Sequence, residues 1–277
     1  MIVLALVITI YLLISLAVPR LFSGFIGAYL VQPILWCLLI LVTLLVSKYG
    51  GGGKLHFRRS LLWVALLIGA FQVALMLIAG LFFGFGHSPY SHTPGMLFIN
   101  LAFMGSALIG IEFSRAYLVD TFAERTPVLV VALTAVLHTG VMVPLMRFIG
   151  LGNGLGFLTF AGGTIIPLLA MNLLASFLAL LGGPVACLAY VGVLQLFEWY
   201  SPILPDLSWA ASALVGIIGP TVGFMVVQSG FLAKGEPSEA ESEQKTGFIG
   251  DRLGNCGYHL SRMVLFRPRW LSSYNSW

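Results

Sequence analysis

The sequence predicts an all-α, polytopic membrane protein: a helix bundle with about eight transmembrane helices and both termini in the cytoplasm. Composition is the first observation behind this prediction, since 59% of the residues are hydrophobic and only 9% are charged, whereas about a quarter of the residues of a soluble domain are charged. The second observation is that the apolar residues form long stretches. The third is that Lys and Arg fall mostly in the segments between those stretches.

Eight stretches are apolar enough to cross a bilayer. A spanning helix needs roughly 20 mostly apolar residues, because each residue adds about 1.5 Å and the hydrocarbon core is about 30 Å thick. In chain order the stretches are residues 2–18, 30–46, 61–83, 96–111, 127–146, 165–181, 184–199 and 209–231. The first lacks a preceding basic segment and a clear small-residue cleavage site, so we expect a retained span rather than a signal peptide.

The positions of Lys and Arg predict the orientation, because cytoplasmic loops carry an excess of basic residues. The segment 48–59 holds four of them and is therefore placed in the cytoplasm. With eight alternating spans, four more also fall inside: Arg115, Arg125, Lys234 and Lys245. Before the tail, only Arg20 and Arg147 fall outside. We expect a multi-pass protein of the cytoplasmic (inner) membrane that contacts the lipid bilayer and binds no nucleic acid, since no aromatic-interleaved basic stripe is present.

The charged residues also predict the domain boundaries. Residues 1–231 are expected to form the transmembrane domain, and residues 232–277 a cytoplasmic linker with a disordered tail. The linker, residues 236–245, is acidic and contains Ser. The tail, residues 246–277, contains five charged residues at a density that no bilayer core tolerates: Asp251, Arg252, Arg262, Arg267 and Arg269.

Three ionisable residues in or next to the apolar stretches are candidates for function, because such groups are costly inside a membrane. Glu112 and Arg115 are three residues apart on one helix face, and His138 lies within the fifth stretch. The favoured interpretation is an interfacial ion pair that closes the end of the fourth helix, with His138 satisfied in the bundle interior. The alternative is a catalytic pair. The three cysteines are far apart, and we expect no metal or cofactor site.

Two segments predicted to lie on the outer face have an unusual content. Residues 86–94 contain His87, Tyr90 and His92, and residues 198–206 contain Trp199, Tyr200 and Asp206. The favoured interpretation is a pair of interfacial turns with aromatic residues at the membrane surface. The alternative is that these six residues form a rim that faces a substrate.

Several of these segments together resemble a known family. They are residues 31–36, 84–90, 99–101, 105–108, 112–119, 182–184 and 197–207. This pattern resembles the amino-terminal membrane region of long, archaeal and endoplasmic-reticulum-type signal peptidase I proteins, over nearly the whole chain to about Gln228. The resemblance implies a role in protein secretion and signal-peptide processing. Its implied partners are a signal peptidase catalytic domain or secretory preproteins.

The catalytic residues of that family have no counterpart here. The nucleophilic Ser of such serine endopeptidases stands before a Met, and this chain contains no Ser-Met pair. No catalytic residue can therefore be transferred to it. The tail reads like a translation in the wrong frame, so the sequence predicts a frameshifted or truncated family member. The alternative is a natural stand-alone membrane domain.

Two other functions stay open at this point. One is an intramembrane protease that resembles the CAAX-type glutamic family, with Glu112, Arg115 and His138 activating water; the usual Glu-Glu pair is absent, since Ile111 precedes Glu112. The other is a small-solute transporter, which is disfavoured because the chain shows no internal repeat.

Overall fold

The computed structural model of the protein describes residues 1–49, 55, 58–124, 126–149 and 154–235. These residues are mostly helical, which confirms the all-α prediction. The chain divides into two compact units, Met1–Phe224 and Met225–Trp277. Within the second unit only the last part of a long helix is described. The predicted tail and most of the predicted loop 48–59 lie outside the described residues.

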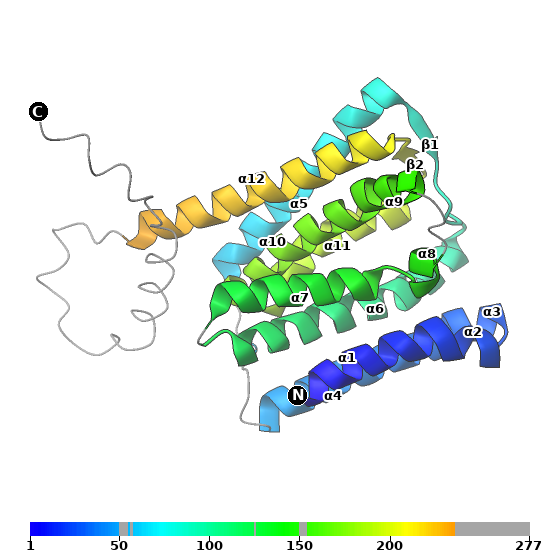
Figure 1. The fold of residues 1–277 in the computed structure, drawn as a ribbon, viewed down its shortest axis with the longest axis horizontal. Coiled ribbons are helices and arrows are strands. Elements are labelled where there is room, and N and C mark those ends of the chain that lie inside the picture. The colour runs from blue at the N-terminus through cyan, green and yellow to red at the C-terminus, as the bar shows by residue number, and fades with distance from the viewer. Residues whose placement is uncertain (50–54, 56–57, 125, 150–153, 236–277) are drawn as a thin grey trace, which may run out of the picture. The chain divides into compact units, whose positions relative to one another are not determined.

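The described elements follow one another in the order shown in Figure 1. The α-helices are α1 (Ile2–Leu12), α2 (Val18–Leu21), α3 (Gly24–Ile26), α4 (Gln32–Tyr49), α5 (Arg59–Phe83), α6 (Pro94–Phe122), α7 (Pro127–Met142), α8 (Leu145–Ile149), α9 (Gly154–Phe160), α10 (Ile166–Gly182), α11 (Pro184–Tyr200) and α12 (Trp209–Gly235). Three π-helical turns interrupt them: η1 (Leu13–Ala17), η2 (Gly27–Val31) and η3 (Ala161–Ile165). The strands are β1 (Phe85–His87) and β2 (Ile203–Pro205).

Six described helices are long and apolar enough to cross a membrane. They are Ile2–Leu21, Gly24–Tyr49, Arg59–Phe83, Pro94–Phe122, Gly154–Gly182 and Trp209–Gly230, three of which contain a π-helical turn. This finding supports a multi-pass membrane protein whose apolar helices contact lipid. The number of crossings and the side on which each terminus lies stay predictions.

Two of the predicted spans form shorter helices. α7 has 16 residues and α11 has 17, which gives lengths of about 24 and 26 Å, less than a hydrocarbon core of about 30 Å. α7 ends early because the chain becomes extended at Val143, directly before Pro144, and a residue before proline disfavours the helical conformation. The predicted stretch 127–146 is therefore divided between α7 and α8.

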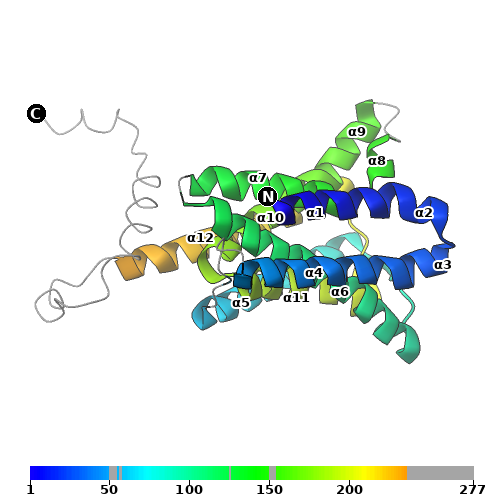
Figure 2. The same ribbon diagram turned by 90° about the horizontal axis from the view of Figure 1, so that it is seen from below.

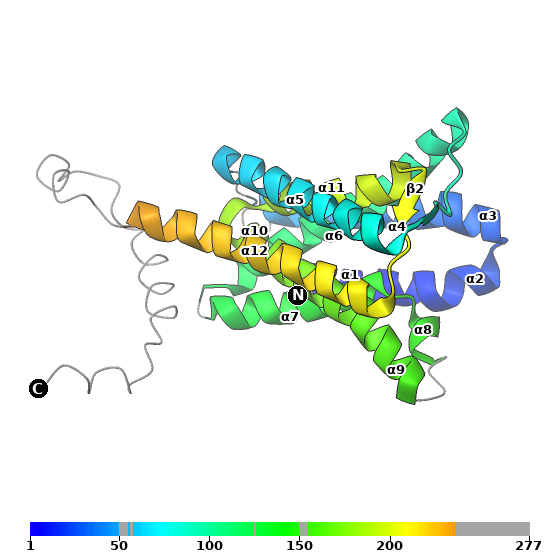
Figure 3. The same cartoon turned by 90° about the horizontal axis from the view of Figure 1, so that it is seen from above.

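The first unit is built from pairs of neighbouring helices. α1 and α4 lie side by side, and both contact α6 (Figures 1 and 2). α5 lies along α11, as Figure 3 shows, while α10 contacts α7, α11 and α6. Buried apolar residues from α1, α4 and α6 form one core cluster, which includes Val7, Leu39 and Tyr117.

Glycines allow two of these helix pairs to approach closely. A Cβ atom at Gly69 of α5 would lie 2.9 Å from the Cβ atom of Val193 on α11. At Gly110 of α6, a Cβ atom would lie 3.2 Å from the ring of Trp36 on α4. Small residues at such contacts are typical of membrane helices, where close van der Waals packing drives association.

The fourth predicted span is shorter than the helix that contains it. It was expected over residues 96–111, but α6 continues through Glu112 and Arg115 to Phe122. Within α6 the Glu112 carboxylate is paired with Arg115, and α10 supplies further hydrogen-bond partners for Arg115. Leu118 and Val119, beyond the ion pair, are buried as well.

Candidate functional site

The ionisable residues predicted from the sequence meet inside the bundle. Glu112 and Arg115 project from α6, and their side chains are 0% exposed. The Arg115 Nε atom donates to Glu112 Oε2 at 2.9 Å, and the Arg115 Nη2 atom donates to Glu112 Oε1 at 3.1 Å. The predicted ion pair is therefore formed, in a two-pronged geometry that suits a guanidinium and a carboxylate. The pair is buried inside the bundle. It lies before the end of α6 and not, as was predicted, at the helix end.

The rest of the Arg115 guanidinium is bound by α10. Its Nη1 atom donates to the backbone oxygen of Asn172 at 3.2 Å and to Ser176 Oγ at 3.1 Å. Its Nη2 atom donates to Asn172 Oδ1 at 2.5 Å. A guanidinium carries five N–H donors, and the hydrogen bonds to Glu112, Asn172 and Ser176 use all five. The side chain has no donor left for a substrate.

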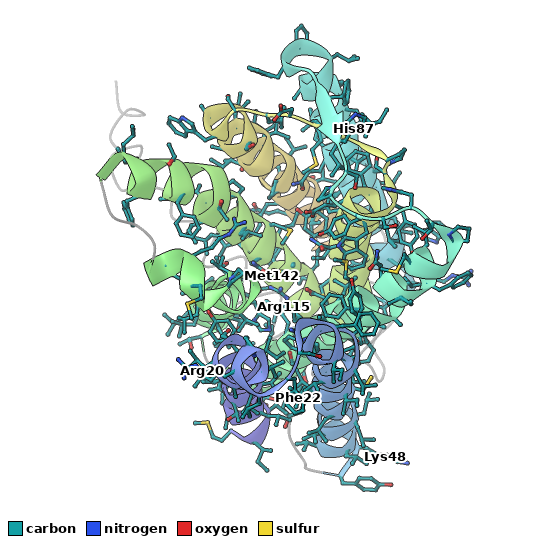
Figure 4. All side chains as sticks on the ribbon, turned by 90° about the vertical axis from the view of Figure 1, so that its right-hand side faces the viewer. Arg20, Phe22, Lys48, His87, Arg115 and Met142 are labelled. Carbon is teal, nitrogen blue, oxygen red and sulfur yellow. The ribbon has the colours of Figure 1, made fainter. Side chains whose placement is uncertain are left out.

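Asn172 extends this buried network to α7. Its Nδ2 atom donates to Thr139 Oγ1 at 3.1 Å and approaches Met142 Sδ at 3.6 Å. Residues 172 and 176 are one helical turn apart, so both reach Arg115 from the same face of α10. Figure 4, which looks at the first unit along its helices, shows Arg115 and Met142 in the interior. The network therefore joins α6, α10 and α7.

His138 lies beside this network. It is 0% exposed, its Nδ1 atom is 2.8 Å from the backbone oxygen of Thr134, and it is close enough to Arg115 to experience its charge. Its Nε2 atom has no hydrogen-bond partner among the described residues. Cys187 on α11 is also 0% exposed, and its sulfur lies 3.8 Å from the backbone oxygen of Glu112. The structure thus brings Glu112, Arg115 and His138 together.

The two segments predicted as outer turns also meet, in a way that their composition did not indicate. β1 and β2 pair in an antiparallel ribbon, with Phe85 opposite Pro205 and His87 opposite Ile203. The ribbon is continued at both ends, because Ser88 N donates to Pro202 O at 3.1 Å and Asp206 N donates to Gly84 O at 3.0 Å. Gly84 itself has a φ of 103°, a conformation that glycine adopts without steric cost.

The six candidate rim residues differ in their exposure around this ribbon. His87 and Asp206 are exposed, whereas Tyr90, His92 and Tyr200 are half-buried. Trp199 is only 6% exposed and does not face outwards.

Two tyrosines help to fix the positions of the rim segments. The Tyr200 hydroxyl donates to the backbone oxygen of Leu97 at 3.3 Å, which attaches the end of α11 to the start of α6. Burial, and secondarily the charge of Glu198, raises the pKa of Tyr90. The segments 86–94 and 198–206 therefore lie close together at Tyr90 as well as in the ribbon.

Some residues in and beside the buried network could not be identified from the sequence. Ser176, Thr139 and Cys187 were not singled out, because a single small polar residue in an apolar helix is a weak signal. The spacing of Asn172 and Ser176 on one face of α10 would have been the available indication. Comparisons with protein-family models, curated proteins and solved structures found no match to this chain.

Proposed function

We propose that this chain is a non-catalytic membrane scaffold in signal-peptide processing, which holds a peptidase domain or its preprotein substrate at the outer surface. One observation carries the non-catalytic part of the proposal: every N–H donor of Arg115 is used by Glu112, Asn172 and Ser176. An arginine whose five N–H donors are all used has none to offer a substrate. Arg115 instead connects α6 with α10. The role in secretion rests on the sequence resemblance described above.

The ribbon formed by β1 and β2 suits a scaffold. The ribbon residues His87 and Ile203 are exposed, while Trp199 and Tyr200 attach the same segments to the helices. An exposed ribbon fixed at both ends offers a rigid surface for an extended polypeptide or a folded domain, because a fixed surface loses little entropy on binding.

A glutamic intramembrane protease is the second candidate function. The meeting of Glu112, Arg115 and His138 in one buried cluster favours it, because carboxylates and imidazoles are the usual groups that activate water. Against it, both carboxylate oxygens of Glu112 accept hydrogen bonds from Arg115, and the side chain is 0% exposed. The same burial disfavours a transporter, in which a solute would have to reach these polar groups.

Reconstitution of the purified chain with a labelled preprotein in liposomes tests both functions. We expect no cleavage by the chain alone. Cleavage that is lost in Glu112→Gln and retained in the exposed control Glu124→Gln would replace the scaffold with the protease.

Site-specific photocrosslinking tests the scaffold itself. A photoreactive residue at Ile203, which is 52% exposed on the ribbon, should capture a preprotein or a signal peptidase domain supplied in trans. The same residue at Leu67, which is 70% exposed on α5, should capture neither. Equal capture at the two positions, or capture at neither, would contradict the scaffold proposal.

A further inference from the structure

A cavity of about 350 Å³ lies between α1, α4 and the junction of α7 with α8. Its volume is at the lower end of the range of small-molecule sites, about 300–1,000 Å³. Most of its wall is apolar, including Ile14, Trp36 and Met146. Three polar residues, Tyr11, Ser15 and Gln32, also line it. The cavity therefore suits an amphiphilic molecule with a hydrocarbon chain and a polar end.

Irregular helix segments lie next to this cavity. Ser15 belongs to the π-helical turn η1, and Gln32 directly follows the π-helical turn η2. On the opposite wall, α7 is interrupted between Met142 and Pro144, and the carbonyl oxygen of Val143 accepts a hydrogen bond from the Tyr11 hydroxyl at 3.0 Å. π-Helical turns occur frequently at functional sites. At membrane depth, irregular backbone is found where it is buried in protein or lines a cavity.

Two arginines directly follow residues that line the same cavity. Pro19 and Met146 line it, and the residues that directly follow them are Arg20, in the last turn of α2, and Arg147, in the last turn of α8. Figures 1 and 2 show α2 and α8 at the same end of the first unit, and Figure 4 shows Arg20 on this side.

The side chains of these two arginines are accessible to a ligand. Both side chains are exposed, and neither forms a salt bridge with a described residue. They are also the two basic residues that the predicted topology places outside, contrary to the general excess of basic residues on the cytoplasmic side. An anionic group bound at this end of the cavity would have a charge complementary to that of the two arginines.

We propose that this cavity binds one anionic phospholipid. One acyl chain occupies the apolar part of the cavity, the phosphate lies between Arg20 and Arg147, and Ser15 and Gln32 hydrogen-bond the polar region that joins the two. Arginine suits a phosphate because its planar N–H groups match two oxygens at once. The charge of the site selects an anionic headgroup, and the apolar volume selects a molecule with a hydrocarbon chain over free phosphate.

The site can be tested by lipid titration of the full chain in nanodiscs. Phosphatidylglycerol should raise the melting temperature and remain bound in native mass spectrometry, in preference to phosphatidylcholine with the same acyl chains. Each arginine near anionic lipid contributes about a five-fold difference in affinity, so the double variant Arg20→Gln/Arg147→Gln should bind phosphatidylglycerol about 30-fold more weakly. The control Arg59→Gln, an exposed arginine at the start of α5, should bind as the wild type does.

Two further measurements separate the acyl chain from the phosphate. Ser15→Phe, which fills part of the cavity, should lower retention of both lipids. Inorganic phosphate at the same concentration should neither raise the melting temperature nor compete with phosphatidylglycerol. Equal binding of the two lipids by the wild type, unchanged selectivity in the double variant, or competition by phosphate alone would each overturn the proposal.

Discussion

Replacement of Arg115 by Met tests the buried network most directly. The substitution removes the cation but leaves the Glu112 carboxylate 0% exposed and without its partner. It also removes the donors that now satisfy Asn172 and Ser176 on α10. Breaking a buried ion pair at one partner typically costs about 3–5 kcal/mol, because the remaining charge stays buried and uncompensated. We therefore expect Arg115→Met to lower the free energy of unfolding by about this amount.

The double variant Glu112→Met/Arg115→Met separates the charge from the other contacts. It removes the unpaired carboxylate, so that only Asn172 and Ser176 lose partners, at roughly 1–3 kcal/mol for unsatisfied buried polar groups. The double variant should therefore be more stable than the single variant. As a control, Arg59→Met changes an exposed arginine and should stay within about 0.5 kcal/mol of the wild type.

These differences can be measured by titrating the purified chain in mixed micelles with dodecyl sulfate. Tryptophan fluorescence reports the unfolding. If Arg115→Met unfolds with the wild type, or if the double variant is no more stable than the single one, the buried pair does not support the bundle as described. The assignment of Glu112 and Arg115 to a structural role would then fail.

Three further predictions concern single contacts. Tyr11→Phe removes the hydrogen bond to the Val143 carbonyl and should cost about 1 kcal/mol, measured by thermal unfolding. Gly69→Val should separate α5 from α11, because even a Cβ atom would lie 2.9 Å from that of Val193. It should lower the free energy of unfolding by about 1–3 kcal/mol. In the same assay the control Gly140→Ala, whose Cβ atom would meet no atom within 4 Å, should be neutral or slightly stabilising. Positions 87 and 203 face each other across the ribbon in a pair that does not exchange backbone hydrogen bonds. The Cα atoms of such a pair are about 4.5 Å apart, so cysteines at these two positions should form a disulfide on oxidation. The disulfide can be detected by gel mobility after proteolysis between the two strands. Absence of this crosslink would contradict the register.

The sequence predicted those features that depend on composition and missed those that depend on distant partners. The long apolar helices, such as α5, follow from hydrophobic runs that can be read in one segment. The fourth span was ended too early because Glu112 and Arg115 resemble an interfacial pair when the partners of Arg115 on α10, 57 and 61 residues away, are not considered. The pairing of β1 with β2 was missed for the same reason.

The π-helical turns and the division of α7 were missed for different reasons. A π-helical turn such as η1 has no composition signal, because the sequence around it is as apolar as that of its neighbours. Pro144 was visible, but hydropathy alone treated residues 127–146 as continuous. The ionisable part of the candidate site could be predicted, because charged residues in apolar stretches are rare, whereas the small polar residues that satisfy them could not.

The distance along the chain between Arg115 and its α10 partners bears on how the protein is made. When α6 leaves the ribosome, Asn172 and Ser176 have not yet been synthesised, so Arg115 can be paired only with Glu112, on its own helix. A charged residue opposes the insertion of a membrane helix, by up to about 2.5–3.5 kcal/mol when it lies at the helix centre. We therefore expect α6 to remain beside the insertion machinery until α10 arrives, and chains stopped before residue 172 should leave α6 accessible to water-soluble labels that the full-length chain excludes.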